Sequence, residues 1–247
     1  MRQVPILVYH WFRPAGRQSD SCAPRFEITP PLFARQMRML EQHGFQAVTL
    51  STALDAAKRR ELPARHIAIT FDDGTADFWE HARPILKEHG FVATLFVVTG
   101  QVGGHNQWDH HLGEPRRSLL SWDQLRALQA EGHEIGSHTH THPRLPGLSD
   151  EAVRQELAGS LETLRSELGA APRQLAYPYG AFLPHHRQLA REVGYASASA
   201  TILGWRDLMG ADRFGLRRMP IKGTESMLRF RLRLQLAGAV LLRTPPP

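Results

Sequence analysis

Short apolar runs alternate with longer amphipathic stretches along most of the 247-residue chain. An apolar run of four to eight residues bounded by turn residues is typical of a buried strand, whereas apolar positions three and four residues apart indicate a helix. The alternation therefore predicts repeated β-α units. The predicted strands are Val4–Tyr9, Gln46–Leu50, His66–Phe71, Val92–Val98, Glu134–Ser137, Gln174–Tyr177, Tyr195–Ala200 and Leu216–Ile221.

Helix signals lie between these strands. The predicted helices are Pro31–His43, Asp77–His89, Ser121–Glu131 and a segment from Ser149 or Asp150 to about Leu168. The first places its apolar positions on one face (Leu32, Phe33, Gln36, Met37 and Leu40). Glycines follow the first three helices as left-handed caps, and Gly169 and Pro172 close the fourth. This succession favours a single α/β domain, a deformed (β/α) barrel of about seven units whose active site lies at the C-terminal ends of the strands.

Composition narrows the chemistry. The only cysteine, Cys22, excludes an intrachain disulfide and a zinc site built from several thiolates, whereas 14 histidines could supply metal ligands. The net charge of +6 would suit an anionic partner, but the basic residues are scattered and lack interleaved aromatics, so we expect no nucleic-acid binding. The stretch from Met1 to Tyr9 is neither a signal peptide nor a membrane span, which predicts a cytoplasmic location.

Three of the predicted strands end in polar or turn residues that could carry chemistry. His66–Phe71 runs into Asp72-Asp73-Gly74, where Gly74 permits a sharp turn; taken alone, the pair of aspartates could equally be a helix cap. After Glu134–Ser137 come His138, His140 and His142. His138 and His142 can share one ion in either a strand or a helix, whereas His140 joins them only in a strand.

The third strand end carries the sequence Ala176-Tyr177-Pro178-Tyr179-Gly180, which alone is ordinary turn chemistry. Taken together and in this order, the three motifs resemble those of the NodB-homology polysaccharide deacetylases, carbohydrate esterase family four. The resemblance spans roughly Val4 to Ile221. It implies a barrel that binds one divalent metal ion and removes N-acetyl groups from sugars.

The resemblance also implies a role for each residue of the motifs. Asp73, His138 and His142 would bind the metal, for which zinc is the first choice and cobalt or nickel are alternatives. Asp72 would be the general base that takes a proton from the attacking water. The backbone N–H of Tyr179 would stabilise the oxyanion, because the preceding Pro178 has no N–H to offer.

Two departures from the common family pattern concern the orienting arginine and the acid histidine. Ala176 occupies the place of an arginine that usually orients the base, and no histidine follows His186 to serve as the acid. The permuted poly-N-acetylglucosamine deacetylase branch has its acid histidine after the first strand, where this chain has His10. By similarity to the late strand of that branch, Arg218 becomes the candidate orienting residue, with Arg217 as the fallback since adjacent strand residues face opposite ways.

Two further segments leave alternatives open. Thr99 to Ser118 has little periodicity, which suggests a functional loop whose Trp108, His110 and His111 either contact a sugar or pack the loop against the barrel. We divide the chain into a barrel of residues 1–224 and a basic amphipathic segment of residues 225–247. That segment is either a last helix covering the barrel or a dimer interface, or a peripheral contact with an anionic membrane.

The sequence thus predicts a metal-dependent hydrolase that removes an N-acetyl group from an amino sugar or glycan intermediate, with Asp72 as base and His10 as acid. Without an export signal, the substrate would be met at the inner face of the membrane. Two alternatives remain: a catalytically silent glycan-binding barrel, and an O-acetyl esterase. The sequence does not indicate the sugar, its linkage or the oligomeric state.

Overall fold

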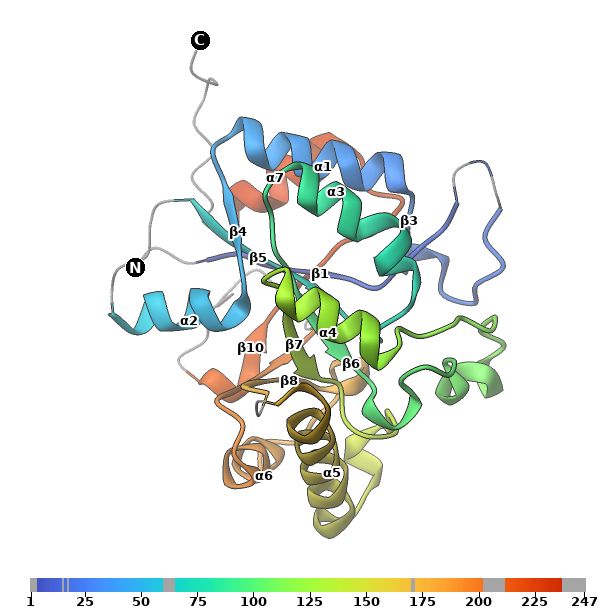
Figure 1. Cartoon of the computed structure of the whole chain (residues 1–247), viewed down its shortest axis with the longest axis vertical. Coiled ribbons are helices and arrows are strands. Elements are labelled where there is room, and N and C mark those ends of the chain that lie inside the picture. Colours follow the sequence, from blue (N-terminus) through green and yellow to red (C-terminus); the bar gives the residue numbers. More distant parts are fainter. Residues whose placement is uncertain are drawn as a thin grey trace.

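A parallel sheet that is nearly closed into a barrel forms the centre of the computed structural model, which describes residues 4–14, 16, 18–59, 65–169, 172–201 and 212–236 (Figure 1). The nine strands of this sheet are β1 Ile6–Tyr9, β4 Gln46–Val48, β5 His66–Phe71, β6 Thr94–Val97, β7 Glu134–Ser137, β8 Gln174–Ala176, β9 Ser197–Ala200, β10 Leu216–Arg217 and β11 Met219–Pro220. All eight predicted strands are present. The predicted Leu216–Ile221 is interrupted at Arg218, which divides it into β10 and β11.

The segment that contains β10 and β11 closes the barrel. β10 pairs with β9 and β11 pairs with β1, so the two halves of one extended segment join the last and first strands of the ring. The other strands follow in the order β9, β8, β7, β6, β5 and β1, all in parallel. β4 pairs with the first half of β5, outside this ring. The predicted β-α alternation favours a parallel sheet with helices, and the structure has the barrel form of this fold class.

Seven α-helices in the described part of the chain surround or close the sheet. They are α1 Pro30–Gln42, α2 Leu50–Arg59, α3 Arg83–Glu88, α4 Trp122–Ala130, α5 Asp150–Leu168, α6 His186–Val193 and α7 Met227–Leu236. The four predicted helices are confirmed, although the second begins with a π-helical turn over Phe78–Ala82. Figure 1 shows α1, α3 and α7 on one side of the sheet and α5 and α6 on the opposite side.

Local sequence explains the ends of these helices. Ser121 and Gln124 form a reciprocal capping box at the start of α4, and the Ser149 hydroxyl accepts the Ala152 N–H at the start of α5. Gly169 ends α5 in the left-handed conformation. These contacts lie within a few residues of one another, which is why the pattern of the sequence could predict them.

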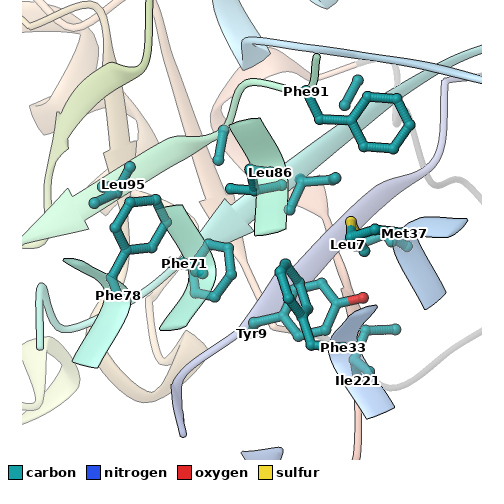
Figure 2. Packing of buried hydrophobic residues seen from close by; sticks show 14 of the residues in the cluster. Leu7, Tyr9, Phe33, Met37, Phe71, Phe78, Leu86, Phe91, Leu95 and Ile221 are labelled. Carbon is teal, nitrogen blue, oxygen red and sulfur yellow. The ribbon is translucent and has the colours of Figure 1, made fainter. Parts of the chain in front are cut away.

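Strand alternation divides the apolar residues between two faces. The side chains of Leu7, Tyr9 and Phe71 belong to the large core cluster that packs against α1 and α3 (Figure 2). The intervening positions Ile6 and Ala68 belong to a separate cluster, with Phe96, Ala176 and Leu216 from other strands and Leu50, Ala53 and Leu54 from α2. Because this second set comes from alternate positions around the ring, it fills the barrel interior.

The same alternation positions the polar residues at the strand ends. Thr70 and Asp72 continue the inward series of Ala68, and Arg218 continues the inward series of Leu216. Met219 and Ile221, in contrast, pack in the outer core. The interior face therefore directs Asp72 and Arg218 toward the same end of the barrel.

The last helix, α7, has one buried and one exposed apolar face. Phe230 and Leu234 are fully buried in the main core, whereas Leu228, Leu232 and Leu236 are exposed. The period-two alternation in this stretch does not make a strand, because a strand would place Leu232 on the same face as Phe230 and Leu234, whereas Leu232 is exposed and the other two are buried. Residues 237–247 of the predicted C-terminal segment lie outside the described residues. Among the described residues no helix is long and apolar enough to cross a membrane.

Candidate active site

Asp72 and Arg218 form a buried ion pair at the end of the barrel where the C-terminal ends of the strands lie. The two terminal nitrogens of Arg218 donate to the two carboxylate oxygens of Asp72, at 2.6 and 2.7 Å. The same guanidinium lies 3.2 Å from the Thr70 hydroxyl and 5.0 Å from the centre of the Phe96 ring. Arg218 is only 1% exposed and Asp72 only 3%, so solvent screens this pair very little.

The ion pair keeps Asp72 ionised. Burial by itself would raise the pKa of this carboxyl group, but the positive charge of Arg218, supported by His138 and His10, lowers it to about 2. Of the two arginines considered from the sequence, it is Arg218 that contacts Asp72. The break between β10 and β11 explains why Arg218 and not Arg217 makes this contact, because Arg218 lies at the break and points into the barrel.

Asp73, His138 and His142 form a compact cluster beside this pair. An oxygen of Asp73 lies 3.5 Å from Nε2 of His138 and 3.6 Å from Nε2 of His142. All three side chains are buried, and one donor atom from each lies within 4.8 Å of the others. One carboxylate and two imidazoles in this arrangement are a donor set that fits a divalent ion such as zinc.

The protonation states of His138, His142 and Asp73 also suit the binding of a divalent ion. Nδ1 of His138 lies 2.8 Å from the carbonyl oxygen of Ala176. Since a carbonyl can only accept, Nδ1 carries the proton and Nε2 keeps its lone pair free for an ion. Burial lowers the pKa of both His138 and His142, so both imidazoles are neutral at pH 7. Burial and the neighbouring Asp72 raise the pKa of Asp73, which a bound cation would counteract.

The backbone at this site is strained. Four non-glycine residues in the described part of the chain have a positive φ, and they are Asp73 at 71°, Thr139 at 67°, His142 at 66° and Tyr179 at 58°. All of them lie in the three motifs at the strand ends. Left-handed backbone is unfavourable for such residues and persists only where the surrounding structure holds it, as is common at functional sites.

The histidine motif is neither a strand nor a helix. β7 ends at Ser137, and left-handed turns at Thr139 and His142 bring the His138 and His142 rings to 4.8 Å. The two geometries considered from the sequence are therefore both wrong for this segment. The His140 side chain points away from His138 and His142. Its Nδ1 lies 3.1 Å from the Thr99 hydroxyl, and the backbone N–H of His140 donates to Glu156.

Glu156 of α5 is a residue that the sequence analysis missed. Its carboxylate accepts the backbone N–H groups of His140 and Thr141 and the Thr141 hydroxyl, at 2.6–2.9 Å. It thus fixes the turn that carries the two metal-ligand candidates. The helix was predicted, but no local signal shows which of its carboxylates reaches a loop 15 residues earlier.

His10 follows β1 and lies in the wall of the same site. Its ring lies 4.6 Å from that of Phe26, and its Nδ1 is buried without a hydrogen-bond partner among the described residues. Burial lowers the pKa of His10 to about 4, while the Asp72 carboxylate opposes this effect. His10 is therefore neutral at pH 7.

The loop from Thr99 to Ser118 packs over the metal-ligand candidates. The Trp108 ring lies 4.8 Å from the His142 ring, and the Tyr179 ring lies 4.7 Å from it as well. Asp109 accepts a hydrogen bond from the Tyr179 hydroxyl at 2.9 Å. The two interpretations of Trp108 both keep support, because the ring packs against the barrel and remains partly exposed, whereas His110 and His111 are exposed.

Residues 59–198 match the family model described as Polysaccharide deacetylase. The chain belongs to this family. The match contains all three of the motifs at the strand ends, from Thr70 to Gly180. His10 and Arg218 lie outside the matched residues, so the family match alone does not place them at the site.

Relatives of this deacetylase-family chain include proteins from Bacillus subtilis and Staphylococcus aureus. YxkH of Bacillus subtilis is 28% identical over 200 residues, which cover 81% of this chain and 64% of that protein. The poly-beta-1,6-N-acetyl-D-glucosamine N-deacetylase of Staphylococcus aureus is 29% identical over 164 residues, which cover 63% of this chain and 54% of that protein. The chain therefore spans less than two thirds of the length of either relative.

Solved structures confirm the fold. The deacetylase PplD from Streptococcus pyogenes, determined in complex with acetate, superposes with a TM-score of 0.78 at 25% identity, covering 94% of this chain and 97% of that one. IcaB from Ammonifex degensii superposes with a TM-score of 0.71 at 23% identity, covering 96% of this chain and all of that one. The predicted barrel and the predicted family are thus both confirmed.

Proposed function

We propose that this chain is a metal-dependent hydrolase that removes N-acetyl groups from an N-acetylated glycan and releases acetate. The family membership and the name of the Staphylococcus aureus relative support this activity. The observation that carries the proposal is the contact between Arg218 and Asp72, right beside the cluster of Asp73, His138 and His142. A charged base and a metal-ligand set share one buried site.

Asp73, His138 and His142 would hold the ion, with zinc as the first choice and cobalt or nickel as alternatives. A divalent ion bound there supplies Lewis acidity, which lowers the pKa of water and polarises an amide carbonyl. Asp72 takes the proton from the attacking water, and Arg218 holds its carboxylate ionised and aimed for that transfer. A general base contributes about 10²–10⁴-fold to the rate.

Tyr179 and His10 complete the proposed machinery. The Tyr179 N–H donates to the oxyanion of the tetrahedral intermediate, because the left-handed turn presents this N–H instead of folding it into a helix. His10 takes up a proton from solvent as the intermediate forms and passes it to the leaving amine. Its pKa is low in the free site, and the negative charge of the intermediate raises it at the step where the proton is needed.

The test is acetate release from a panel of substrates, beginning with β-1,6-linked N-acetylglucosamine oligomers and including O-acetylated sugars, with and without a chelator. We expect release from N-acetyl substrates that is lost on chelation and restored by zinc. Release from O-acetyl substrates alone would show an esterase. A fully metallated protein without turnover on any substrate would favour the glycan-binding barrel.

Location and membrane contact stay predictions. The exposed Leu228, Leu232 and Leu236 on α7 lie beside Arg229 and Arg231, a combination that suits an anionic membrane surface, and the buried Phe230 and Leu234 suit a helix that covers the barrel. Co-sedimentation with anionic and with neutral vesicles tests the membrane contact. Fractionation of cells that express the native protein tests the cytoplasmic location.

A further inference from the structure

The hydrogen bond between Tyr179 and Asp109 joins two parts of the site that are far apart in sequence. The Tyr179 hydroxyl donates to Asp109 at 2.9 Å across 70 residues. Asp109 lies in the 3-10 helix Gln107–Leu112, within the loop that packs over the metal-ligand candidates. Neither the motifs nor the proposed mechanism gives this carboxylate a role.

Tyr179 needs external support for its backbone conformation. Its φ of 58° is a strained value for a tyrosine, and holding such a residue costs about 1–3 kcal/mol. Two contacts restrain its side chain, namely the hydroxyl bond to Asp109 and the packing of the ring on His142 at 4.7 Å. Because φ turns the peptide plane relative to the side chain, fixing the ring also limits the direction of the Tyr179 N–H.

Asp109 itself is held firmly enough to act as an anchor. The Glu114 N–H donates to the Asp109 carbonyl oxygen at 3.3 Å, which closes the short helix. Glu114 and Glu27 both accept hydrogen bonds from the partly buried guanidinium of Arg117, at 2.8–3.2 Å. The carboxylate that receives the Tyr179 hydroxyl is therefore attached to a loop that Arg117 ties to Glu27, a buried residue outside the sheet of the barrel.

Trp108 strengthens the same arrangement. Its ring lies 4.8 Å from the His142 ring, on which Tyr179 also packs. The residue before Asp109 and the partner of Asp109 thus both contact the same candidate metal ligand. A shift of the loop would disturb Tyr179 and His142 together.

We propose that Asp109 is a positioning residue for de-N-acetylation, which holds the Tyr179 ring and thereby the N–H that receives the oxyanion. The inference rests on the proposed function. Loss of the tether lets Tyr179 relax toward negative φ, which rotates its N–H away from the reacting carbonyl. The donor is misaligned rather than deleted, so we expect the turnover number to fall by about 10-fold, less than the ~10²–10³-fold for removal of an oxyanion donor.

The experiment compares kcat, KM and metal content for Asp109→Ala, Tyr179→Phe and the double variant. Each single variant should lower kcat by about 10-fold, with KM and metal content unchanged, and the double variant should be no worse than either one. Asp109→Asn keeps an oxygen that can accept the hydroxyl, and it should retain most of the activity. Asp123→Ala, which removes an exposed carboxylate paired with Arg126, is the matched control and should leave kcat unchanged.

Three results would overturn the proposal: full activity of both single variants, multiplied losses in the double variant, or a higher KM at constant kcat, which would mean that Asp109 binds the substrate directly. If Asp109→Ala does not fold, as judged by circular dichroism, Tyr179→Phe and Asp109→Asn carry the test. A wild-type protein that releases no acetate would contradict the proposed function instead, so the two failures are distinguishable.

Discussion

Arg218 and Asp72, 146 residues apart, meet through two parallel hydrogen bonds of 2.6 and 2.7 Å inside the barrel. The contact depends on the closure of the ring, because Arg218 lies where the closing segment passes from β9 to β1. The backbone N–H of Arg218 donates to the Ala200 carbonyl oxygen of β9, and the backbone N–H of Ile221 donates to the Val8 carbonyl oxygen of β1. The segment that closes the barrel therefore also orients the carboxylate of Asp72, the proposed base.

Replacing Arg218 with methionine should leave a buried carboxylate without its partner. We expect the free energy of unfolding to fall by about 3–5 kcal/mol, since such a charge cannot be solvated. Arg218→Lys keeps the charge but loses the two parallel hydrogen bonds of the guanidinium. It should therefore reduce the rate of acetate release more strongly than it reduces the free energy of unfolding. Urea denaturation and acetate release measure the two effects.

The matched control for this prediction is Arg83→Met. Arg83 makes the same two-bond contact with Glu131, but at the surface, where a salt bridge contributes only about 0–1 kcal/mol. An equal loss of stability in both methionine variants would contradict the assignment of the effect to burial.

Asp72→Asn and His138→Ala should separate the base from the metal ligands. The amide that Asp72→Asn introduces cannot take a proton from water, so we expect at least about 10²-fold slower acetate release with normal metal content. Removal of the His138 imidazole takes away a proposed ligand, so metal content and activity should fall together. Metal analysis of the purified variants makes the comparison, and unchanged release by Asp72→Asn would show that the base is wrongly assigned.

Acid should destabilise the fold partly through His133, a buried histidine outside the site. Its Nδ1 accepts the Ala93 N–H at 3.1 Å, and burial lowers the pKa of this histidine although Glu131 opposes the shift. The unfolded chain takes up this proton near pH 6.5 and the folded chain only at lower pH. The free energy of unfolding should therefore decrease as the pH falls below about 6.5, by at most about 1.4 kcal/mol per pH unit for this proton.

His133→Asn keeps an acceptor for the Ala93 N–H but removes the titration, so the stability of this variant should depend less steeply on pH than that of the wild type between pH 7 and 5. Denaturation curves across this pH range measure the slopes. Parallel curves for wild type and His133→Asn would rule out the contribution of His133.

Gly180→Ala should perturb the turn that carries the proposed oxyanion donor. Gly180 has a φ of 64°, and an added Cβ would lie 2.8 Å from the carbonyl oxygen and 2.9 Å from the nitrogen of Thr201. We expect the turn to shift, with at least about 10-fold lower kcat and a loss of about 1–2 kcal/mol in stability. Gly147→Ala is the control, because open space surrounds the position of its Cβ. Normal kcat in Gly180→Ala would show that the turn tolerates displacement.

The sequence by itself determined the eight predicted strands, four of the seven helices in the described part of the chain, and the order of the chemistry along them. Strand alternation, helix caps and glycine stops act between residues close in the chain, so the strands and the four helices followed from local pattern. The motif Thr70-Phe71-Asp72-Asp73-Gly74 could be placed at a strand end for the same reason. The family resemblance added roles to residues that the pattern had already located.

Only the tertiary structure decided which of these residues meet. The pattern left Arg217 and Arg218 as alternatives, and the inward alternation at the barrel seam brings Arg218 to Asp72. Left-handed turns join His138 with His142 and exclude His140, because the sign of φ at a non-glycine residue depends on surrounding contacts such as those of Glu156. The bond from Tyr179 to Asp109 has no local signature, since packing across 70 residues creates it.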